Sequence, residues 1–320
     1  MTFSVLFDVS QLLIAFLVIW LGAGLLLNSI EKLSKLLHLS QFTLSLFLLG
    51  TATSFPEIAV LVNALILKEP EVAMGNLIGG QVFLLFAVIP LLAIITRGLR
   101  LQAQMQGKLL LLIISVVAVP LVTLMDGKVQ TWEGFLTLVL YGTFVITFSR
   151  KMTALERITK KLIRPPQINP VLEIGKVLGG VVILLLATQL AIRGVTNISA
   201  HYALHPFLVS MIVMALGTNL PEFSLAVRGA LSGKRDIVLG DYIGSATMNT
   251  LLWAVLVFAS PGTIYMTQTV LPMIFVIVTG LLLFWYFCRT HKKLSIGEGL
   301  ILILVYAAFL GVTTWMELGF

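Results

Sequence analysis

Two short stretches decide the fold: TSFPE at residues 53–57 and TNLPE at residues 218–222. Each lies inside a long apolar run and ends on a glutamate that directly follows a proline. The two stretches are 165 residues apart (218 − 53), and the same offset superposes residues 42–80 on 207–245 without a gap, with nine identical positions. It also superposes Glu133 on Glu298 near the end of each half. The chain is therefore predicted to be an internal duplication.

The composition places both copies in a lipid bilayer. Of the 320 residues, 58% are hydrophobic and only 11% are charged, which is too little polar surface for a water-soluble globule. Lipid cannot satisfy exposed backbone groups, so each apolar run long enough to cross a bilayer is predicted to be a helix. Ten such runs are expected, at residues 12–27, 42–67, 72–96, 109–124, 131–148, 177–192, 204–230, 237–259, 270–287 and 300–315. The predicted fold class is an all-α membrane protein with ten transmembrane helices.

Five helices in each half make the two copies opposite in direction. Because five is odd, the second half must enter the membrane upside down relative to the first. The expected organisation is a first five-helix repeat at residues 1–149 and a second, inverted repeat at 177–320. A basic, proline-containing linker at 150–176 joins them. Inverted repeats are typical of alternating-access carriers, with the site between the halves near the middle of the membrane.

The basic residues predict the orientation of the helices. With ten spans, all 21 lysines and arginines except Lys68, Lys128 and Arg193 fall on one side, which the positive-inside rule assigns to the cytoplasm. The linker is then cytoplasmic and both termini are extracytoplasmic, in an integral protein of the cell membrane. The net charge of +7 does not indicate nucleic-acid binding, because the basic residues fall between apolar runs rather than along one face. The single cysteine, Cys288, excludes an intrachain disulfide.

The paired glutamates carry the chemistry. A carboxylate at the bilayer centre costs about 2.5–3.5 kcal/mol on insertion scales, so Glu57 and Glu222 are expected either to pair with another group or to serve a function. The proline before each one cannot donate to the helix ladder and frees a carbonyl one turn earlier, at Ala52 or Gly217. Carbonyl, hydroxyl, amide and carboxylate oxygens together suit calcium, sodium or magnesium. The purely structural alternative is a protonated glutamate bonded to a neighbouring helix. The presence of a glutamate at the equivalent position of both repeats disfavours it.

A second motif opens the next helix of each half. It reads GNLIGG at residues 75–80 and GDYIGS at residues 240–245. Gly79 and Gly244 are expected to allow close helix packing. Ser245 and Asn249 are four residues apart and share a helix face, so both could point at the ion, although core hydrogen bonding would explain them as well.

Together these motifs resemble the two alpha-repeats of the sodium/calcium exchanger family, within the calcium/cation antiporter superfamily. The resemblance covers essentially the whole chain and implies a prokaryotic-type, ten-helix member. By this similarity, the side chains on ion-coordinating positions are those of Thr53, Ser54, Glu57, Thr218, Asn219, Glu222 and Ser245. Gly50 and Ala215 fall on backbone-carbonyl ligand positions, and Asn249 stands where the family has aspartate or asparagine.

The chain departs from the family in its first repeat. Gly80 and Leu84 stand where serine and asparagine are usual, so side-chain oxygens are missing from one half of the expected cage. Fewer ligands put a three-for-one sodium stoichiometry in doubt. Gln81 could compensate if its side chain turns inward. Asp241 could handle protons, although a helix-start carboxylate is the simpler interpretation.

The expected function is secondary antiport of Ca²⁺ or another divalent cation for Na⁺, with Ca²⁺/H⁺ exchange at the same site as the alternative. The expected partners are the lipid bilayer and inorganic cations, with no cofactor, no nucleic acid and no protein partner inferable. The remote alternatives are an intramembrane aspartyl enzyme built on Asp241 and a passive cation channel. Val238 replaces the first glycine of the aspartyl motif, and inverted duplication favours a carrier over a channel.

Overall fold

The computed structural model describes residues 2–36, 50–100, 107–156, 169–231, 235–266, 270–290 and 293–318. The first half contains α1 (Thr2–Leu36), α3 (Gly50–Thr53), α4 (Phe55–Leu67), α5 (Pro70–Phe83), the π-helix η2 (Leu84–Val88), α6 (Ile89–Ile95), β1 (Leu99–Arg100), α7 (Lys108–Thr123), β2 (Lys128–Val129) and α8 (Thr131–Glu156). The second half contains α9 (Pro170–Tyr202), α10 (Pro206–Val209), the π-helix η4 (Ser210–Met214), α11 (Ala215–Thr218), α12 (Leu220–Leu231), α13 (Arg235–Ala259), β3 (Ile264–Tyr265), α14 (Leu271–Thr290), β4 (Lys293–Leu294) and α15 (Ile296–Leu318).

These elements form the ten-helix transmembrane fold that the hydropathy predicted. Within the described residues, seven helices are long and apolar enough to cross a membrane alone. Three shorter apolar helices, Phe55–Leu67, Lys108–Thr123 and Pro206–Thr218, occupy the other three predicted spans. Two of these three belong to helices that are broken in mid-span, which is why they are short. The first eight residues of the predicted second span, 42–49, lie outside the described residues.

Helix boundaries differ from the prediction around the linker. α8 continues to Glu156 and α9 already begins at Pro170, so helix extends into both ends of the expected 150–176 segment. Asn169 caps α9, its side-chain oxygen accepting from the backbone nitrogens of Val171 and Leu172. This cap and a proline at the first helical position explain the early start. Residues 157–168 lie outside the described part of the chain.

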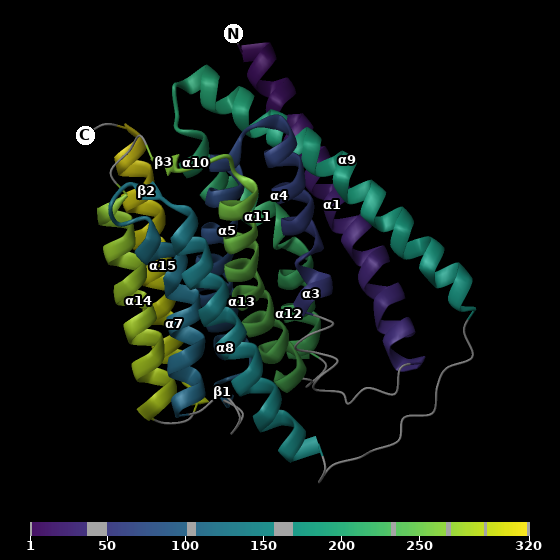
Figure 1. The fold of residues 1–320 in the computed structure, drawn as a ribbon, viewed down its shortest axis with the longest axis vertical. Coiled ribbons are helices and arrows are strands. Elements are labelled where there is room, and N and C mark those ends of the chain that lie inside the picture. Colours follow the sequence, from purple (N-terminus) through teal and green to yellow (C-terminus); the bar gives the residue numbers. More distant parts are fainter. Residues whose placement is uncertain are drawn as a thin grey trace.

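Two small antiparallel ladders show the inverted repeat directly. β1 pairs with β4, and β2 pairs with β3. The 165-residue offset converts β1 into β3 and β2 into β4, so it converts one ladder into the other. The β1 ladder lies at the lower end of the molecule in Figure 1 and the β2–β3 ladder at the upper end. The two halves therefore run in opposite directions through the bundle.

The helices that follow β2 and β4 start in the same way. The Glu133 carboxylate accepts a hydrogen bond from the Gln130 backbone nitrogen at 2.7 Å, and Glu298 accepts one from the Ser295 backbone nitrogen at 2.7 Å. This is the reciprocal half of a capping box, which satisfies an otherwise unpaired amide at a helix start. Both halves of the chain thus keep the same local device at equivalent positions.

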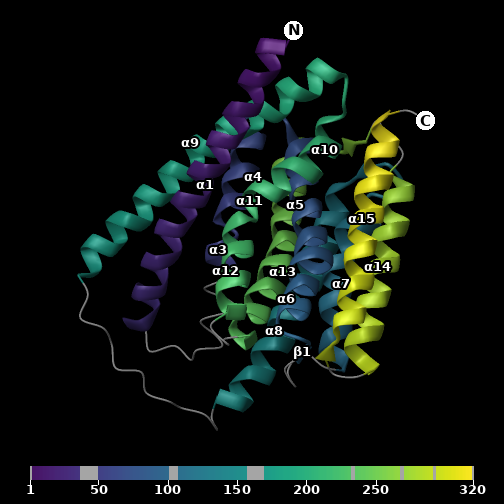
Figure 2. The ribbon, with the colours of Figure 1, turned by 180° about the vertical axis from the view of Figure 1, so that it is seen from behind.

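α1 and α9, which are equivalent under the repeat, pack on each other and lie obliquely beside the bundle (Figures 1 and 2). Their backbones approach closely at Gly180, where an added Cβ would lie 3.0 Å from the Leu26 Cβ. At one end the pair is joined by the Glu173 carboxylate, which lies 3.2 Å from Lys32 Nζ and 2.9 Å from Lys176 Nζ.

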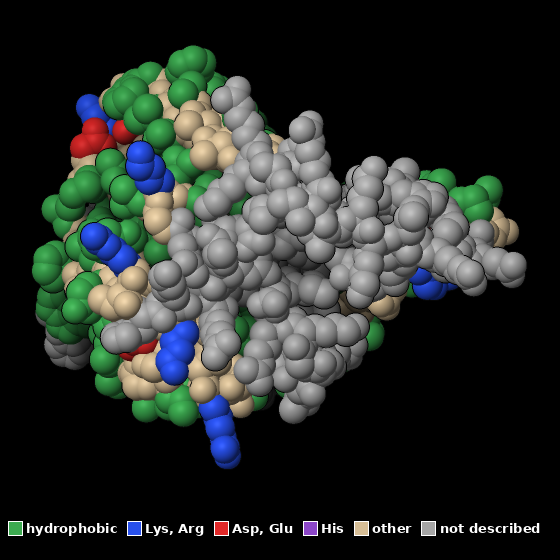
Figure 3. All heavy atoms as spheres, turned by 90° about the horizontal axis from the view of Figure 1, so that it is seen from below, with side chains coloured by type: hydrophobic (Ala, Val, Ile, Leu, Met, Phe, Trp, Pro, Cys, Tyr) green, Lys and Arg blue, Asp and Glu red, His purple; other side chains and the backbone are tan. Residues whose placement is uncertain are grey.

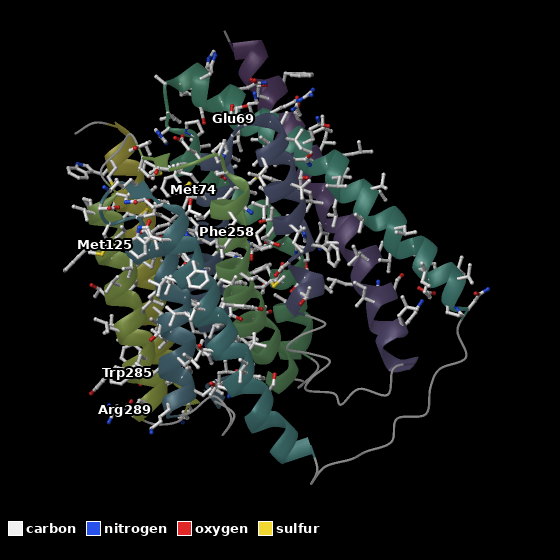
Figure 4. The ribbon with its side chains drawn as sticks, viewed as in Figure 1. Glu69, Met74, Met125, Phe258, Trp285 and Arg289 are labelled. Atoms are coloured by element: carbon white, nitrogen blue, oxygen red, sulfur yellow. The ribbon has the colours of Figure 1, made fainter. Side chains whose placement is uncertain are left out.

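Charge is distributed unequally between the two ends of the bundle. N and C mark the same, upper end in Figures 1 and 2. The opposite end, viewed in Figure 3, carries several Lys and Arg side chains around an apolar perimeter. Arg289 at this end lies over the Trp285 ring, 5.1 Å from its centroid (Figure 4). This sidedness agrees with the predicted partition of the basic residues.

Candidate ion-binding site

Each half contains one helix that breaks in the middle of its span. The break separates α3 from α4 at Ser54 and α11 from α12 at Asn219, which are equivalent residues of the two repeats. Both have nearly the same backbone angles, φ −80° and ψ 6° at Ser54 and φ −90° and ψ 9° at Asn219. The cause is the proline two residues later, which has no N–H to give to the preceding turn.

The break places each glutamate in the first turn of a new helix. Glu57 lies in the first turn of α4 and Glu222 in the first turn of α12. Unpaired backbone N–H groups give a helix N-terminus a partial positive charge, which stabilises a carboxylate there. Both are nevertheless buried, at 1% and 0% exposure. The helix N-termini thus supply only partial charge compensation for two buried acids.

A hydrogen-bonded chain joins the two repeats at this point. Ser245 Oγ on α13 lies 3.4 Å from Glu222 Oε1, to which it donates, and 3.2 Å from Ser54 Oγ at the other break. Thr218 Oγ1 donates to Asn76 Oδ1 on α5 at 3.0 Å. Residues that are up to 191 positions apart in sequence therefore meet in one buried polar cluster.

The cluster is lined by oxygens that the described residues leave without a hydrogen bond. They are both carboxylate oxygens of Glu57 and the side-chain oxygens of Asn219 and Asn249. The amide nitrogens of the two asparagines are fixed, because Asn219 Nδ2 donates to Ala215 O at 2.8 Å and Asn249 Nδ2 donates to Leu77 O at 3.3 Å. Buried acceptors without donors are costly unless a cation or water reaches them. Such oxygens are the ligands that hard cations prefer.

The glycine of the first repeat faces the same cluster. A Cβ at Gly80 would lie 3.0 Å from the Asn219 amide nitrogen and 3.0 Å from that of Asn249. The missing side-chain oxygen at this position therefore makes room for two asparagine amides. Leu84, the other departure, is fully buried at the start of η2.

Gln81 is bonded to the neighbouring helix. Its amide nitrogen donates to Ala246 O at 3.1 Å and to Thr250 Oγ1 at 2.9 Å, both on α13. Its nitrogen is thus committed to helix packing, which limits the compensation expected from this residue. Ala246 is the residue equivalent to Gln81 in the other repeat, so α5 and α13 cross at the axis that relates the halves.

The two expected carbonyl ligands differ in what the structure shows. Ala215 O accepts two hydrogen bonds, from the Asn219 backbone nitrogen at 3.2 Å and from its side chain at 2.8 Å. A metal contact at this carbonyl requires Asn219 to release it. Gly50 begins α3, and the preceding residues lie outside the described chain. The Asp241 side chain also lies outside the described part, so its expected role stays a prediction.

The packing role predicted for the glycines of the second motif is confirmed at Gly79. A Cβ there would lie 2.0 Å from Met211 O, and one at Gly75 would lie 2.1 Å from Phe207 O. α5 therefore touches the backbone of the broken helix with nothing between them.

Sequence reasoning missed two residues that support the site. Asn76 accepts from Thr218, and the Tyr242 hydroxyl donates to the backbone carbonyl of Glu222 at 2.8 Å. Both lie inside the second motif of their repeat, Asn76 directly after Gly75 and Tyr242 two residues after Gly240. Their position in the motif was the available signal, but only the fold shows which groups they reach.

Comparison with known proteins agrees with this architecture. A family model described as sodium/calcium exchanger protein matches residues 8–150 and 173–315. The putative antiporter CaxA of Alkalimonas amylolytica is 26% identical over 255 residues, 78% of this chain and 79% of that protein. The inner membrane protein YrbG of Escherichia coli K12 is 22% identical over 318 residues, 96% of each chain.

Two solved structures share the fold. The sodium-calcium exchanger NCX_Mj superposes with a TM-score of 0.66 at 20% identity, over 96% of this chain and 99% of that one. The H⁺/Ca²⁺ exchanger CAX superposes with a TM-score of 0.75 at 12% identity, over 97% and 87%. Since the family model covers most of both halves, the chain belongs to the sodium/calcium exchanger family of membrane antiporters, which are cation transporters and not enzymes.

Proposed function

We propose that the chain exchanges Ca²⁺, or another divalent cation, for Na⁺ by alternating access at a site built on Glu57 and Glu222. The observation that supports this most is the pair of buried glutamates at equivalent breaks of two inverted helices, where Ser245 bonds both Glu222 and Ser54 of the opposite break. The proposed ligand set adds the side chains of Thr53, Thr218, Asn219 and Asn249 and the carbonyls of Gly50 and Ala215.

Charge balance explains how such a site couples two fluxes. Two ionised carboxylates carry a charge of minus two, which one divalent ion or two monovalent ions neutralise. An unloaded pair is costly in a low-dielectric interior, so the empty carrier resists the swing between its two open states. Loaded forms cross and the empty form does not, which makes each flux depend on the other.

The counter-ion is Na⁺ in this proposal, and H⁺ is the alternative. Protons compete with metal for the same carboxylate oxygens. The absence of side-chain oxygens at Gly80 and Leu84 favours a site that holds fewer sodium ions than three. We also propose that the chain resides in the cell membrane, with the basic end of Figure 3 in the cytoplasm and both termini outside.

Reconstituted vesicles test the proposal. Purified protein in proteoliposomes is expected to take up Ca²⁺ when an outward Na⁺ gradient is imposed, and an outward H⁺ gradient without Na⁺ tests the alternative. Glu57→Gln and Glu222→Gln are each expected to abolish uptake, because one carboxylate cannot balance a divalent ion. Glu133→Gln is the matched control, since glutamine still completes a capping box away from the breaks. Normal Ca²⁺ uptake by both single variants would refute the site.

A further inference from the structure

Helix α1 contacts the broken helix of the second repeat on both sides of its break. It packs on α11 and on α12, and Figure 2 shows it running beside them. On the α11 side, the Phe16 ring lies against Gly217, where an added Cβ would stand 2.2 Å from two ring carbons. On the α12 side, one helical turn further along α1, the Trp20 indole nitrogen donates to Ser224 Oγ at 2.9 Å. The break at Asn219 therefore lies between two contacts with one helix.

Trp20 lies at an unusual depth for a tryptophan. It is near the middle of the apolar span Phe7–Ile30, whereas Trp132 and Trp315 lie near the ends of α8 and α15. Tryptophan is enriched at the two membrane interfaces, where one side of the ring is apolar and the indole N–H meets water. In mid-span the N–H needs an acceptor from the protein, because lipid hydrocarbon offers none. Ser224 is that acceptor, so the bond fixes how α1 packs on α12.

The bond lies next to one of the two buried glutamates. Ser224 follows Glu222 by two residues (224 − 222), which is about 3 Å along the helix axis. On its other side Glu222 is held by α13, where Tyr242 donates to its carbonyl and Ser245 to its carboxylate. The start of α12 is thus bonded to α13 on one side and to α1 on the other.

The first repeat cannot make the same bond. At the positions equivalent to the donor and the acceptor it has Leu185 and Ala59, whose side chains carry no polar atom. Its broken helix is joined to α9 at Asn63 instead, whose amide nitrogen donates to Leu185 O at 2.7 Å. Asn63 follows Glu57 by six residues (63 − 57), which is about 9 Å along the axis. The bond from α1 is therefore not a feature of the duplicated scaffold, and it lies much closer to its glutamate.

We propose that Trp20 is a positioning residue for Glu222 in the exchange proposed above, on which this inference rests. The bond to Ser224 sets the place of α12 against α1 and, through the first turn of α12, the place of the Glu222 carboxylate among the other ligands. Groups that orient metal ligands contribute to affinity without touching the metal. Without the bond the start of α12 can shift, which weakens cation binding in the unloaded carrier and leaves the movement of the loaded carrier largely unchanged.

Ca²⁺ uptake into proteoliposomes under an outward Na⁺ gradient, measured over a range of Ca²⁺ concentrations, tests the proposal. Trp20→Phe keeps an aromatic ring and removes the N–H donor, and Ser224→Ala removes the acceptor. Each is expected to raise the Ca²⁺ concentration for half-maximal uptake by about threefold to tenfold, with the maximal rate changed by less than about twofold. The double variant should be no worse than either single variant, because both substitutions remove the same bond.

Two further variants serve as controls. Ser224→Thr keeps a hydroxyl and is expected to restore the half-maximal concentration of the parent protein. Trp132→Phe makes the same substitution at an exposed tryptophan and is expected to leave uptake unchanged. Thermal unfolding in detergent shows whether each variant keeps the stability of the parent protein.

The possible failures of the inference and of the exchange itself are distinguishable. An unchanged half-maximal concentration in Trp20→Phe and Ser224→Ala would overturn the inference alone. A loss confined to the maximal rate or to thermal stability would also overturn it, because the bond would then be purely structural. Fully additive effects in the double variant would show that the two side chains do not act through one bond. A parent protein that takes up no Ca²⁺ under a Na⁺ or an H⁺ gradient would refute the proposed exchange, and this inference with it.

Discussion

Gly80→Ala tests whether two asparagine amides occupy the place of a side chain in the first repeat. The added Cβ would stand 3.0 Å from each amide nitrogen, whereas ordinary contacts begin at 3.4 Å. Each amide must therefore withdraw by about 0.4 Å (3.4 − 3.0). The Asn249 bond to Leu77 O is already 3.3 Å long and is the first to be lost.

The expected cost follows from these distances. Overpacking of a filled interior costs about 1–3 kcal/mol, and a lost hydrogen bond about 1 kcal/mol. Replacing glycine by alanine inside a helix returns about 1 kcal/mol, so a net loss of about 1–3 kcal/mol in the free energy of unfolding is expected. The displaced amide oxygens are proposed cation ligands, so Ca²⁺ binding should weaken as well. A loss of about 1.4 kcal/mol raises the Ca²⁺ concentration for half-maximal uptake tenfold.

Proteoliposome uptake over a range of Ca²⁺ concentrations gives the concentration for half-maximal uptake. Thermal unfolding in detergent gives the stability. Gly142→Ala is the matched control, because a Cβ at Gly142 in α8 would meet nothing within 4 Å. Its uptake should equal that of the parent protein. If Gly80→Ala also kept a half-maximal Ca²⁺ concentration within twofold of the parent, the two amides would not line the cation site.

Two further substitutions examine the supports of the site. Tyr242→Phe removes the hydroxyl that donates to Glu222 O, so half-maximal uptake should require about fivefold more Ca²⁺, which corresponds to about 1 kcal/mol. Tyr286→Phe changes an exposed tyrosine and is the control; an equal effect there would show that the bond to Glu222 O has no special role. Glu298→Ala removes the carboxylate that accepts from Ser295 and should lower the free energy of unfolding by about 1 kcal/mol, whereas Glu298→Gln should keep most of that stability. Thermal unfolding measures both variants, and equal losses would contradict the capping role.

Much of this architecture could be predicted from the sequence, because it follows from the internal duplication and from the constraints that a lipid bilayer places on the backbone. Apolar runs in a bilayer have essentially one solution, the helix, and a repeat of five spans has to invert. The proline directly before each glutamate predicted a disrupted helix ladder at the Ala52 and Gly217 carbonyls, two residues before the breaks at Ser54 and Asn219. The helix ends around the linker were less predictable, because α8 and α9 continue beyond the apolar runs into polar sequence, where hydropathy carries no signal.

The contacts inside the site were beyond sequence reasoning for a different reason. The direction in which an asparagine side-chain oxygen points depends on what holds its amide nitrogen, and the partners of these nitrogens, Ala215 O and Leu77 O, are backbone groups. Backbone acceptors exist at every residue and leave no mark in the sequence. The same holds for the Tyr242 hydroxyl, which reaches a carbonyl twenty residues away.

The crossing of α5 and α13 shows why glycine fits at position 80 of the first repeat. Gln81 bonds to Ala246, its own equivalent, so the two helices cross at these positions. Because the halves run in opposite directions, residues on either side of this point face partners that are not their equivalents. A Cβ at Gly80 would meet the Asn249 amide nitrogen, which already donates to Leu77 O at 3.3 Å. A serine at position 80, as at the equivalent Ser245, would place its Cβ 3.0 Å from the amide nitrogens of both Asn219 and Asn249. The cluster is asymmetric because a close-packed interior admits at this point either the two asparagine amides or a side chain at position 80.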